Sequence, residues 1–258
     1  MKRFIAGVMA MLLLAVACQT EKLESTEESG ILDIAISGEP SFDVLVKSQT
    51  LSVEEAAGYN VSIFTDSDVL KYGPVEYSAF EAQVLPLGTY YVTAENLTTT
   101  EAEEGNGQMR LAGRSNDVVL TPSAISQTAT VECKVTNAKV AVEFDSSVSG
   151  MFDNLKVVLT GGTTSGRTLT VAETAAGTVT ETWFNPSNLS YTISGTFKPT
   201  GKPLTLSNSR TLAAKDNIKV LVKLNLENGE ISGAPEIVVD VTMSQATPVE
   251  EEFNPYAK

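Results

Sequence analysis

The residues that could do chemistry in this chain are carboxylates, because the 258-residue sequence holds 32 acidic side chains and no histidine. The lack of histidine excludes Ser-His-Asp and Cys-His catalysis and removes the commonest ligand of zinc and iron. Neither a Walker sequence nor a dinucleotide fingerprint occurs, and Gly161-Gly162 falls in a Thr- and Ser-rich turn. We therefore expect no enzymatic activity and no cofactor.

Clustered carboxylates could still cleave glycosidic bonds if the fold brought two of them together. Glu101, Glu103 and Glu104 cluster in an expected loop before Gly105, and Glu250 to Glu252 form a run near the C-terminus. Like charges repel each other and prefer water. We therefore interpret both groups as solvated.

Calcium is the metal ion that so many oxygen ligands could bind. Asp66 and Asp68 place two carboxylates in a loop after an expected strand. An EF-hand loop would need further ligands and a terminal glutamate in register, which residues 69–80 do not provide. We predict no specific metal site.

Two pairs of adjacent aromatic residues, Tyr90-Tyr91 and Trp183-Phe184, could stack on sugar rings. Neighbouring side chains in a strand point to opposite faces of the sheet, so we expect one member of each pair in the core. For Trp183 we favour a core position over ligand binding.

The N-terminus predicts export and lipid attachment. Lys2 and Arg3 precede an uncharged run from Phe4 to Ala17, in which small residues lie directly before Cys18. This order is typical of a secretory signal, and the run is shorter than the roughly 20 residues that span a bilayer. It resembles the lipobox of bacterial lipoproteins, so we predict residues 1–17 as the signal peptide and Cys18 as the lipid attachment site. An ordinary cleavable signal that contains a cysteine is the alternative.

The mature chain must reach its membrane through the lipid, because a net charge of −14 for the whole chain repels nucleic acids and anionic headgroups. Residues 18–30 are rich in Glu, Ser and Thr, and we predict them as an acidic tether. Its glutamates resemble the export tags of Bacteroidota surface lipoproteins, with a plain solvated spacer as the alternative. If Cys18 is acylated, Cys133 has no disulfide partner, and its alternating run predicts a small buried hydrophobe.

Beyond Gly30 the dominant pattern is the alternation of apolar and polar residues that is typical of half-buried strands. It is clearest over residues 218–226. The runs 129–135 and 140–144 alternate in the same way, and we predict that they are neighbouring strands. Asn228-Gly229 predicts a hairpin turn, while residues 52–57 predict only a short connecting helix or turn. Further predicted strands are residues 32–36, 60–65, 89–94, 117–120, 155–160, 167–171, 178–184, 190–197 and 236–243.

Strands so short and so many, with no helix for a parallel crossover between them, predict an all-β protein of antiparallel sandwiches. We favour two consecutive β-sandwich domains, an N-terminal one over residues 31–128 and a C-terminal one over residues 129–258 that ends in an acidic tail. A single larger sandwich is the alternative.

Several segments resemble the fimbrillin-like lipoproteins of Bacteroidota, a group that includes fimbrial subunits, anchors, tips and uncharacterised surface relatives. Residues 85–90, Leu-Pro-Leu-Gly-Thr-Tyr, resemble the "LPxGxY" turn of the group, and residues 118–144, with the element Val-Thr-Asn-Ala-Lys-Val at 135–140, resemble the strand pair between its two domains. The resemblance implies transthyretin-like domains on a lipid-anchored protein of the outer membrane, exposed at the cell surface. It also implies a role in cell adhesion or fimbria-like assembly.

In the polymerising members of this group a protease cuts after a basic residue and opens a groove for a neighbour's strand. Lys47 is the nearest candidate, but no clear cleavage signature follows it, so an uncleaved anchor, a tip or a stand-alone adhesin is an equal alternative. Strand addition needs an alternating donor. Residues 31–37 alternate well, whereas residues 248–258 are acidic and interrupted by proline.

The expected partners are therefore the membrane, through the N-terminal lipid, and other fimbrial subunits or host or bacterial surface proteins or glycans, with no nucleic acid. A glycan-binding lipoprotein of a nutrient-uptake system, with glycan cleavage favoured less, is the alternative function. A periplasmic structural lipoprotein is the third.

Overall fold

The computed structural model describes residues 28–38, 49–50, 55–164, 166–174, 177, 179–225, 236–243 and 246–253, with the backbone alone for 49–50, 225, 236–243 and 246–253. The predicted signal peptide, Cys18, Lys47 and the Asn228-Gly229 turn lie outside the described residues. All described elements are strands or single 3₁₀ turns, which confirms the all-β prediction.

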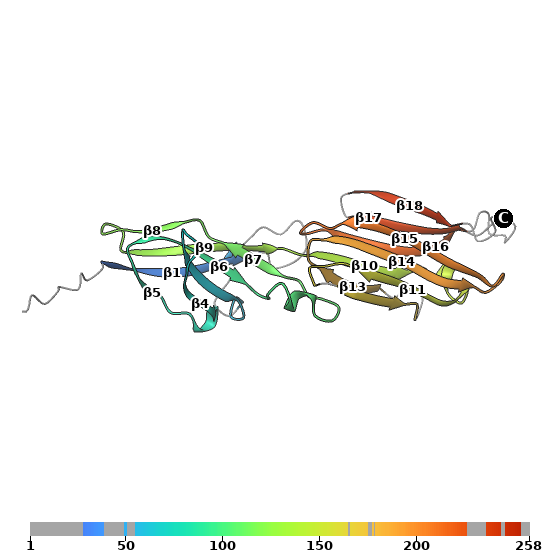
Figure 1. Ribbon diagram of the computed structural model, residues 1–258, viewed down its shortest axis with the longest axis horizontal. Helices are drawn as coiled ribbons and strands as arrows, with labels where there is room; N and C mark the ends of the chain where they lie inside the picture. The colour runs from blue at the N-terminus through green and yellow to red at the C-terminus, as the bar shows by residue number, and fades with distance from the viewer. Residues whose placement is uncertain are drawn as a thin grey trace, which may run out of the picture.

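The first half of the chain forms one sheet that curls around its own core (Figure 1). Its strands are β1 (Ser29–Gly38), β2 (Gln49–Thr50), β3 (Asn60–Thr65), β4 (Leu70–Glu76), β5 (Gln83–Pro86), β6 (Gly88–Glu95), β7 (Leu111–Arg114), β8 (Val118–Leu120) and β9 (Ser126–Val135). The 3₁₀ turns are η1 (Tyr77–Ala79) and η2 (Glu101–Glu103). The strand order is β2-β1-β9-β7-β6-β3-β4, with β5 paired to β1 and β8 paired to β6.

The second half forms two sheets. Its strands are β10 (Ala138–Phe144), β11 (Phe152–Thr160), β12 (Thr168–Ala172), β13 (Val179–Phe184), β14 (Asn188–Phe197), β15 (Lys202–Thr211), β16 (Asn217–Asn225), β17 (Glu236–Met243) and β18 (Ala246–Phe253), with a 3₁₀ turn η3 (Ser146–Val148). One sheet has the order β13-β10-β16-β17-β18 and the other β12-β11-β14-β15. In Figure 1 these strands and the first nine form two bodies that follow each other along the long axis.

Two hydrophobic cores match the two bodies. The first core is made by β1, β3, β6 and β9 with their neighbours, and the second by residues of both sheets of the second half. In β16 the alternating residues Ile218, Val220, Val222 and Leu224 are all buried, as their spacing predicts. Cys133 is fully buried in the first core, which confirms it as a small core residue.

The chain crosses from one core to the other between β9 and β10. These two strands were predicted as neighbours, and that prediction is wrong, because β9 pairs with β1 and β7 while β10 pairs with β13 and β16. Alternation tells which face of a strand is apolar, but it carries no information on the partner strand. The boundary predicted after Thr128 falls inside β9, whose buried residues all pack in the first core.

Most strand pairs are antiparallel, as predicted. The exceptions among the described strands are β1 with β9 and β10 with β16, which are parallel. The backbone of the acidic run at 250–252 lies in β18, paired with β17, whereas its side chains, which are predicted to be solvated, lie outside the described part of the chain. β16 and β17 pair antiparallel, as the predicted hairpin requires.

Candidate functional site

The junction between the two cores is the most elaborate polar site among the described residues. The first body contributes the loop of residues 96–110, between β6 and β7, which carries η2 and contacts β13 (Figure 1). The second body contributes the turn at 161–167 and the end of β13. The link at residues 136–137 runs between them.

Glu103 is the centre of this junction and is only 5% exposed. Its carboxylate accepts hydrogen bonds from the backbone N–H of Thr163 at 2.9 Å, of Thr164 at 2.8 Å and of Asn185 at 3.1 Å. The hydroxyl of Thr163 donates a further bond at 3.2 Å. A carboxylate of the first body is thus held by backbone donors of the second, the kind of charge-assisted contact that is strongest away from water.

The charge on Glu103 is stabilised by these bonds. Burial raises the pKa of Glu103, but the hydrogen bonds from Thr164, Thr163 and Asn185 outweigh burial and lower the pKa to about 2. The prediction that this glutamate is solvated is therefore wrong, because protein N–H groups replace the water. It holds for Glu101 and Glu104, which are exposed.

Arg167 bridges the two bodies from the other side of the junction and is 9% exposed. Its Nη1 donates to the carbonyl of Trp183 at 2.8 Å, and its Nη2 donates to the carbonyl of Gly105 at 3.2 Å. The guanidinium lies 4.3 Å from the centre of the Phe184 ring. Burial lowers the pKa of Arg167, and the charge of Glu103 opposes this shift.

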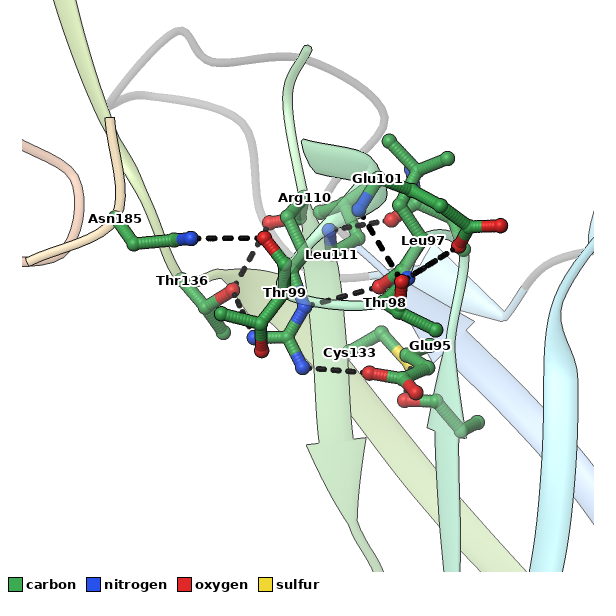
Figure 2. Close-up of polar contacts among 12 residues, drawn as sticks. Glu95, Leu97, Thr98, Thr99, Glu101, Arg110, Leu111, Cys133, Thr136 and Asn185 are labelled. Atoms are coloured by element: carbon green, nitrogen blue, oxygen red, sulfur yellow. Dashed lines mark hydrogen bonds and ion pairs between the residues drawn. The ribbon is translucent and has the colours of Figure 1, made fainter. Parts of the chain in front are cut away.

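Two buried asparagines complete the contact. The Asn185 amide donates to the carbonyl of Thr99 at 2.9 Å (Figure 2). Asn137, in the link, accepts a bond from the N–H of Arg110 at 3.0 Å and donates to the carbonyl of Gln108 at 2.7 Å. Asn137 thus fixes the loop against the link, and Asn185 fixes it against the end of β13.

Arg110 holds the base of the loop, as Figure 2 shows. It forms an ion pair with Glu95 at 2.5 Å and donates to the carbonyl of Leu97 at 2.9 Å and to the hydroxyl of Thr136 at 3.1 Å. Its side chain is 18% exposed, so these bonds are largely shielded from solvent. One arginine therefore ties β6, the loop and the link together.

Trp183 and Phe184 lie on opposite faces of β13, as predicted for adjacent residues of a strand. Phe184 is fully buried in the second core, whereas Trp183 is partly buried and packs against the first. The backbone N–H of Trp183 also donates to the carbonyl of Asn106 at 2.9 Å. Gly107, at φ +79°, passes so close to Trp183 that a Cβ would collide with the backbone of Trp183.

The tyrosine pair follows the same rule. Tyr90 is in the first core, with its hydroxyl bonded to the carbonyl of Pro86 at 2.8 Å. Tyr91 faces outward, but Phe64 stacks on its ring at 5.2 Å and the Arg114 guanidinium lies 3.8 Å from its centre. Because Tyr90 is 3% exposed and Tyr91 is 7% exposed, this pair offers no open platform to a sugar.

The Asp66-Asp68 loop is engaged by protein groups. The Tyr91 hydroxyl donates to Asp68 at 2.8 Å, and the Ser67 hydroxyl donates to Asp66 at 3.3 Å. Among the residues that the structure describes, no three His, Cys, Asp or Glu side chains lie close enough together to hold a metal ion. In the same part of the chain, no helix is long and apolar enough to cross a membrane.

A surface hollow of about 600 Å³ lies where β11 bulges between Asp153 and Lys156. Its aromatic and aliphatic wall residues, Phe152 and Leu155, are themselves buried in the second core. The hollow is lined by Phe152, Asn154, Leu155, Lys156, Ala172 and Glu173.

The strand predicted as the best donor, residues 31–37, lies in β1. It pairs with β9 on one side and with β5 and β2 on the other. Within the described residues, β18 pairs with β17 alone and lies at the edge of its sheet. In the same part of the chain, β4, β12, β13 and β15 also end their sheets, so β18 is one of several strands with a backbone edge that no described strand covers.

The family model described as "Domain of unknown function (DUF4493)" matches residues 28–255. The chain belongs to this family. All described residues of the DUF4493 chain, including both cores and the junction, lie within the match. Among curated proteins, none matches the sequence.

Solved structures similar to the DUF4493 chain include fimbrial proteins, candidate adhesins and a candidate polysaccharide-binding protein. A candidate adhesin from Bacteroides ovatus has a TM-score of 0.50 at 9% identity, over 89% of this chain and 96% of that one. A candidate cell adhesion protein from Bacteroides eggerthii has a TM-score of 0.46 at 15% identity, over 84% of this chain and 96% of that one. The fimbrial anchor protein Mfa2 from Porphyromonas gingivalis has a TM-score of 0.43 at 13% identity, over 83% of this chain and 97% of that one. The resemblance is confirmed at the level of the fold by the B. ovatus candidate adhesin.

Proposed function

We propose that this protein is a non-enzymatic surface lipoprotein, attached to the outer membrane through Cys18, that mediates cell adhesion or fimbria-like assembly. The observation that carries the proposal is the junction, where buried Glu103 and Arg167 join two cores end to end. A molecule built in this way holds its two ends apart, which suits a protein that must connect a membrane to a distant partner. The fold shared with the B. ovatus candidate adhesin supports the same function.

The proposal includes two consecutive transthyretin-like sandwich domains, after a signal peptide at 1–17 and a tether at 18–30. Their boundary is best drawn at Thr136 and Asn137, because β9 packs in the first core and β10 in the second. The two separate clusters of buried residues support this division, since each domain is expected to have its own core.

Partners would bind through strand edges and loops. An edge strand such as β18 presents unpaired backbone groups, and an incoming strand of a fimbrial subunit would satisfy them. β1 is paired on both sides, and its removal would expose the first core, as strand removal does in the polymerising members. A shaft subunit and an uncleaved anchor, tip or stand-alone adhesin are therefore equal alternatives within this proposal.

Expression of the full chain and of Cys18→Ala in a Bacteroidota host tests the proposal. We expect the wild type to carry an acyl group on Cys18 by mass spectrometry, to be degraded by protease added to intact cells, and to crosslink to fimbrial subunits or a host surface protein. The Cys18→Ala variant should leave the membrane fraction. An unmodified Cys18, or a failure of the wild type to bind any surface protein or glycan, would contradict it.

A further inference from the structure

Exposed aliphatic side chains gather at the end of the molecule where the described chain begins. Of the seven exposed large hydrophobic residues among the described ones, three meet there, namely Ile31 at 44%, Val84 at 69% and Ile125 at 55%. Ile31 lies directly opposite Val84 across β1 and β5, and its N–H donates to the carbonyl of Ile125 at 2.5 Å. We call these three residues the tip patch.

A fourth exposed residue lies on a neighbouring strand. Val119 is 50% exposed and belongs to β8, which contacts both β1 and β9. Figure 1 shows β8 and β5 with the start of β1 at the same end of the molecule, opposite to the C-terminal strands.

Apolar residues are out of place at these positions. Leu32 and Leu85 point into the first core, so the adjacent Ile31 and Val84 point to the outer face, where an antiparallel sheet in water carries polar residues. Asp33, the next outward residue of β1, follows that rule. Grouped aliphatic residues on an outer face are typical of a surface that contacts something apolar.

The position of the tip patch indicates which apolar surface it contacts. The carbonyl of Glu28 accepts a bond from the N–H of Leu87 at 2.9 Å, so the chain enters the fold beside β5 and the patch. Cys18 precedes Glu28 by ten residues. Ten residues reach at most about 36 Å when fully extended. An acyl group on Cys18 would therefore keep the tip patch within one short tether of the bilayer.

We infer that the tip patch rests on the apolar boundary of the bilayer and sets the orientation of the anchored protein. This inference rests on the lipid attachment proposed above. Three side chains bury too little area to hold a free protein on a membrane, but the tether already supplies the local concentration, so a small contact suffices to orient the molecule. Glu28 and Asp33 beside the patch favour zwitterionic over anionic headgroups.

The test couples the mature chain, residues 18–258, through Cys18 to a maleimide lipid in phosphatidylcholine nanodiscs, so it does not depend on acylation in the cell. Cys133 does not compete, because it is fully buried and burial, followed by the charge of Glu95, raises its pKa to about 12. Isoleucine and valine methyl NMR is recorded with a spin-labelled lipid in the disc. We expect the methyl signals of the tip patch to lose severalfold more intensity than those of Val179, which is 47% exposed on β13.

The double variant Val84→Ser, Ile125→Ser should remove most of the difference in signal loss between Ile31 and Val179. The matched control is Val69→Ser, Leu70→Ser, at exposed positions outside the patch, and it should keep this difference. Circular dichroism checks that both variants fold. Equal broadening of the tip patch and Val179 in the tethered wild type would overturn the inference. A failure of the proposed lipid attachment can be told apart from a failure of this inference. It would leave Cys18 unmodified in cells, but it would not change the nanodisc result, in which the lipid is attached chemically.

Discussion

Glu103 illustrates how a charged residue can be buried at little cost. Its carboxylate leaves water but gains backbone donors from two segments of the second body, the turn at 163–164 and Asn185. Removal of a charged hydrogen-bond partner inside a protein usually costs more than the bond contributed, because the other groups stay buried and unpaired. The junction therefore depends on this one side chain.

The first prediction concerns the pH dependence of this contact. The folded pKa of Glu103 is about 2, below its ordinary value of 4.5, so its contribution is complete above pH 4.5 and is lost as the pH falls toward 2. We expect Glu103→Gln to lower the free energy of unfolding by about 3 kcal/mol at pH 7. The difference between wild type and variant should shrink steadily between pH 5 and pH 2, as measured by urea unfolding.

The exposed Glu104→Gln is the control and should change the free energy of unfolding by less than about 0.5 kcal/mol at pH 7. A difference between wild type and Glu103→Gln that stayed constant down to pH 3 would show that the carboxylate charge is not what stabilises the junction.

The second prediction compares two glycines of one turn. Gly162 and Gly166 have φ of +89° and +74°, but a Cβ on Gly162 would collide with the Glu103 carboxylate, while one on Gly166 would meet nothing within 4 Å. Gly166→Ala should cost about 1–2 kcal/mol for the backbone conformation. Gly162→Ala should cost about 2 kcal/mol more, because Glu103 must also move. Equal losses of stability in the two variants, measured by thermal unfolding, would contradict the close approach of Gly162 to Glu103.

At the scale of elements, alternation predicted the strands with one fully buried face and also the edge strands β12 and β13, but it missed β4 and β15 at edges and β7, which lies between β9 and β6. β1, β6, β9, β10 and β16 were found because one full face of each is buried. β15 is mostly exposed and pairs with β14 alone, and β4 ends its sheet. An edge strand buries less of either face, so its sequence need not alternate. The polar sequence of β15 is therefore typical of a loop.

The loop at 96–110 behaves as an element in its own right because Arg110 ties its base. The third prediction is that Arg110→Ala speeds amide hydrogen exchange across residues 101–108, since three bonds to Glu95, Leu97 and Thr136 are lost. Arg114→Ala is the control, because its ion pair with Asp117 is about half exposed and contributes little to the loop. Exchange is measured by mass spectrometry, and unchanged rates in Arg110→Ala would contradict this account of the loop.

On the scale of the whole molecule, the junction makes one extended body out of two cores. Trp183 belongs to a strand of the second body but packs against the first core, and Asn137 pairs the link with the loop. Such contacts couple the unfolding of the two halves, because neither can open without exposing a part of the other.

The fourth prediction is that Trp183→Ala uncouples the halves. Loss of the indole should remove about 2–4 kcal/mol of packing across the junction. We expect scanning calorimetry to show one transition for the wild type and two for Trp183→Ala. The control Val179→Ala, at an exposed position of the same strand, should keep a single transition. One unchanged transition in Trp183→Ala would mean that the halves are coupled elsewhere.

The amino-acid sequence by itself determined the all-β class, the buried faces of the strands, the buried Cys133 and the opposite faces of Trp183 and Phe184. All of these follow from period-two geometry, which is a local property of an extended chain. Only the tertiary structure decided that β9 and β10 belong to different cores and that Glu103 is buried. The burial of Glu103 depends on backbone donors some 60 residues further along the chain, and the partner strands of β9 and β10 are also distant in sequence. No local pattern of side chains records where such distant segments will lie.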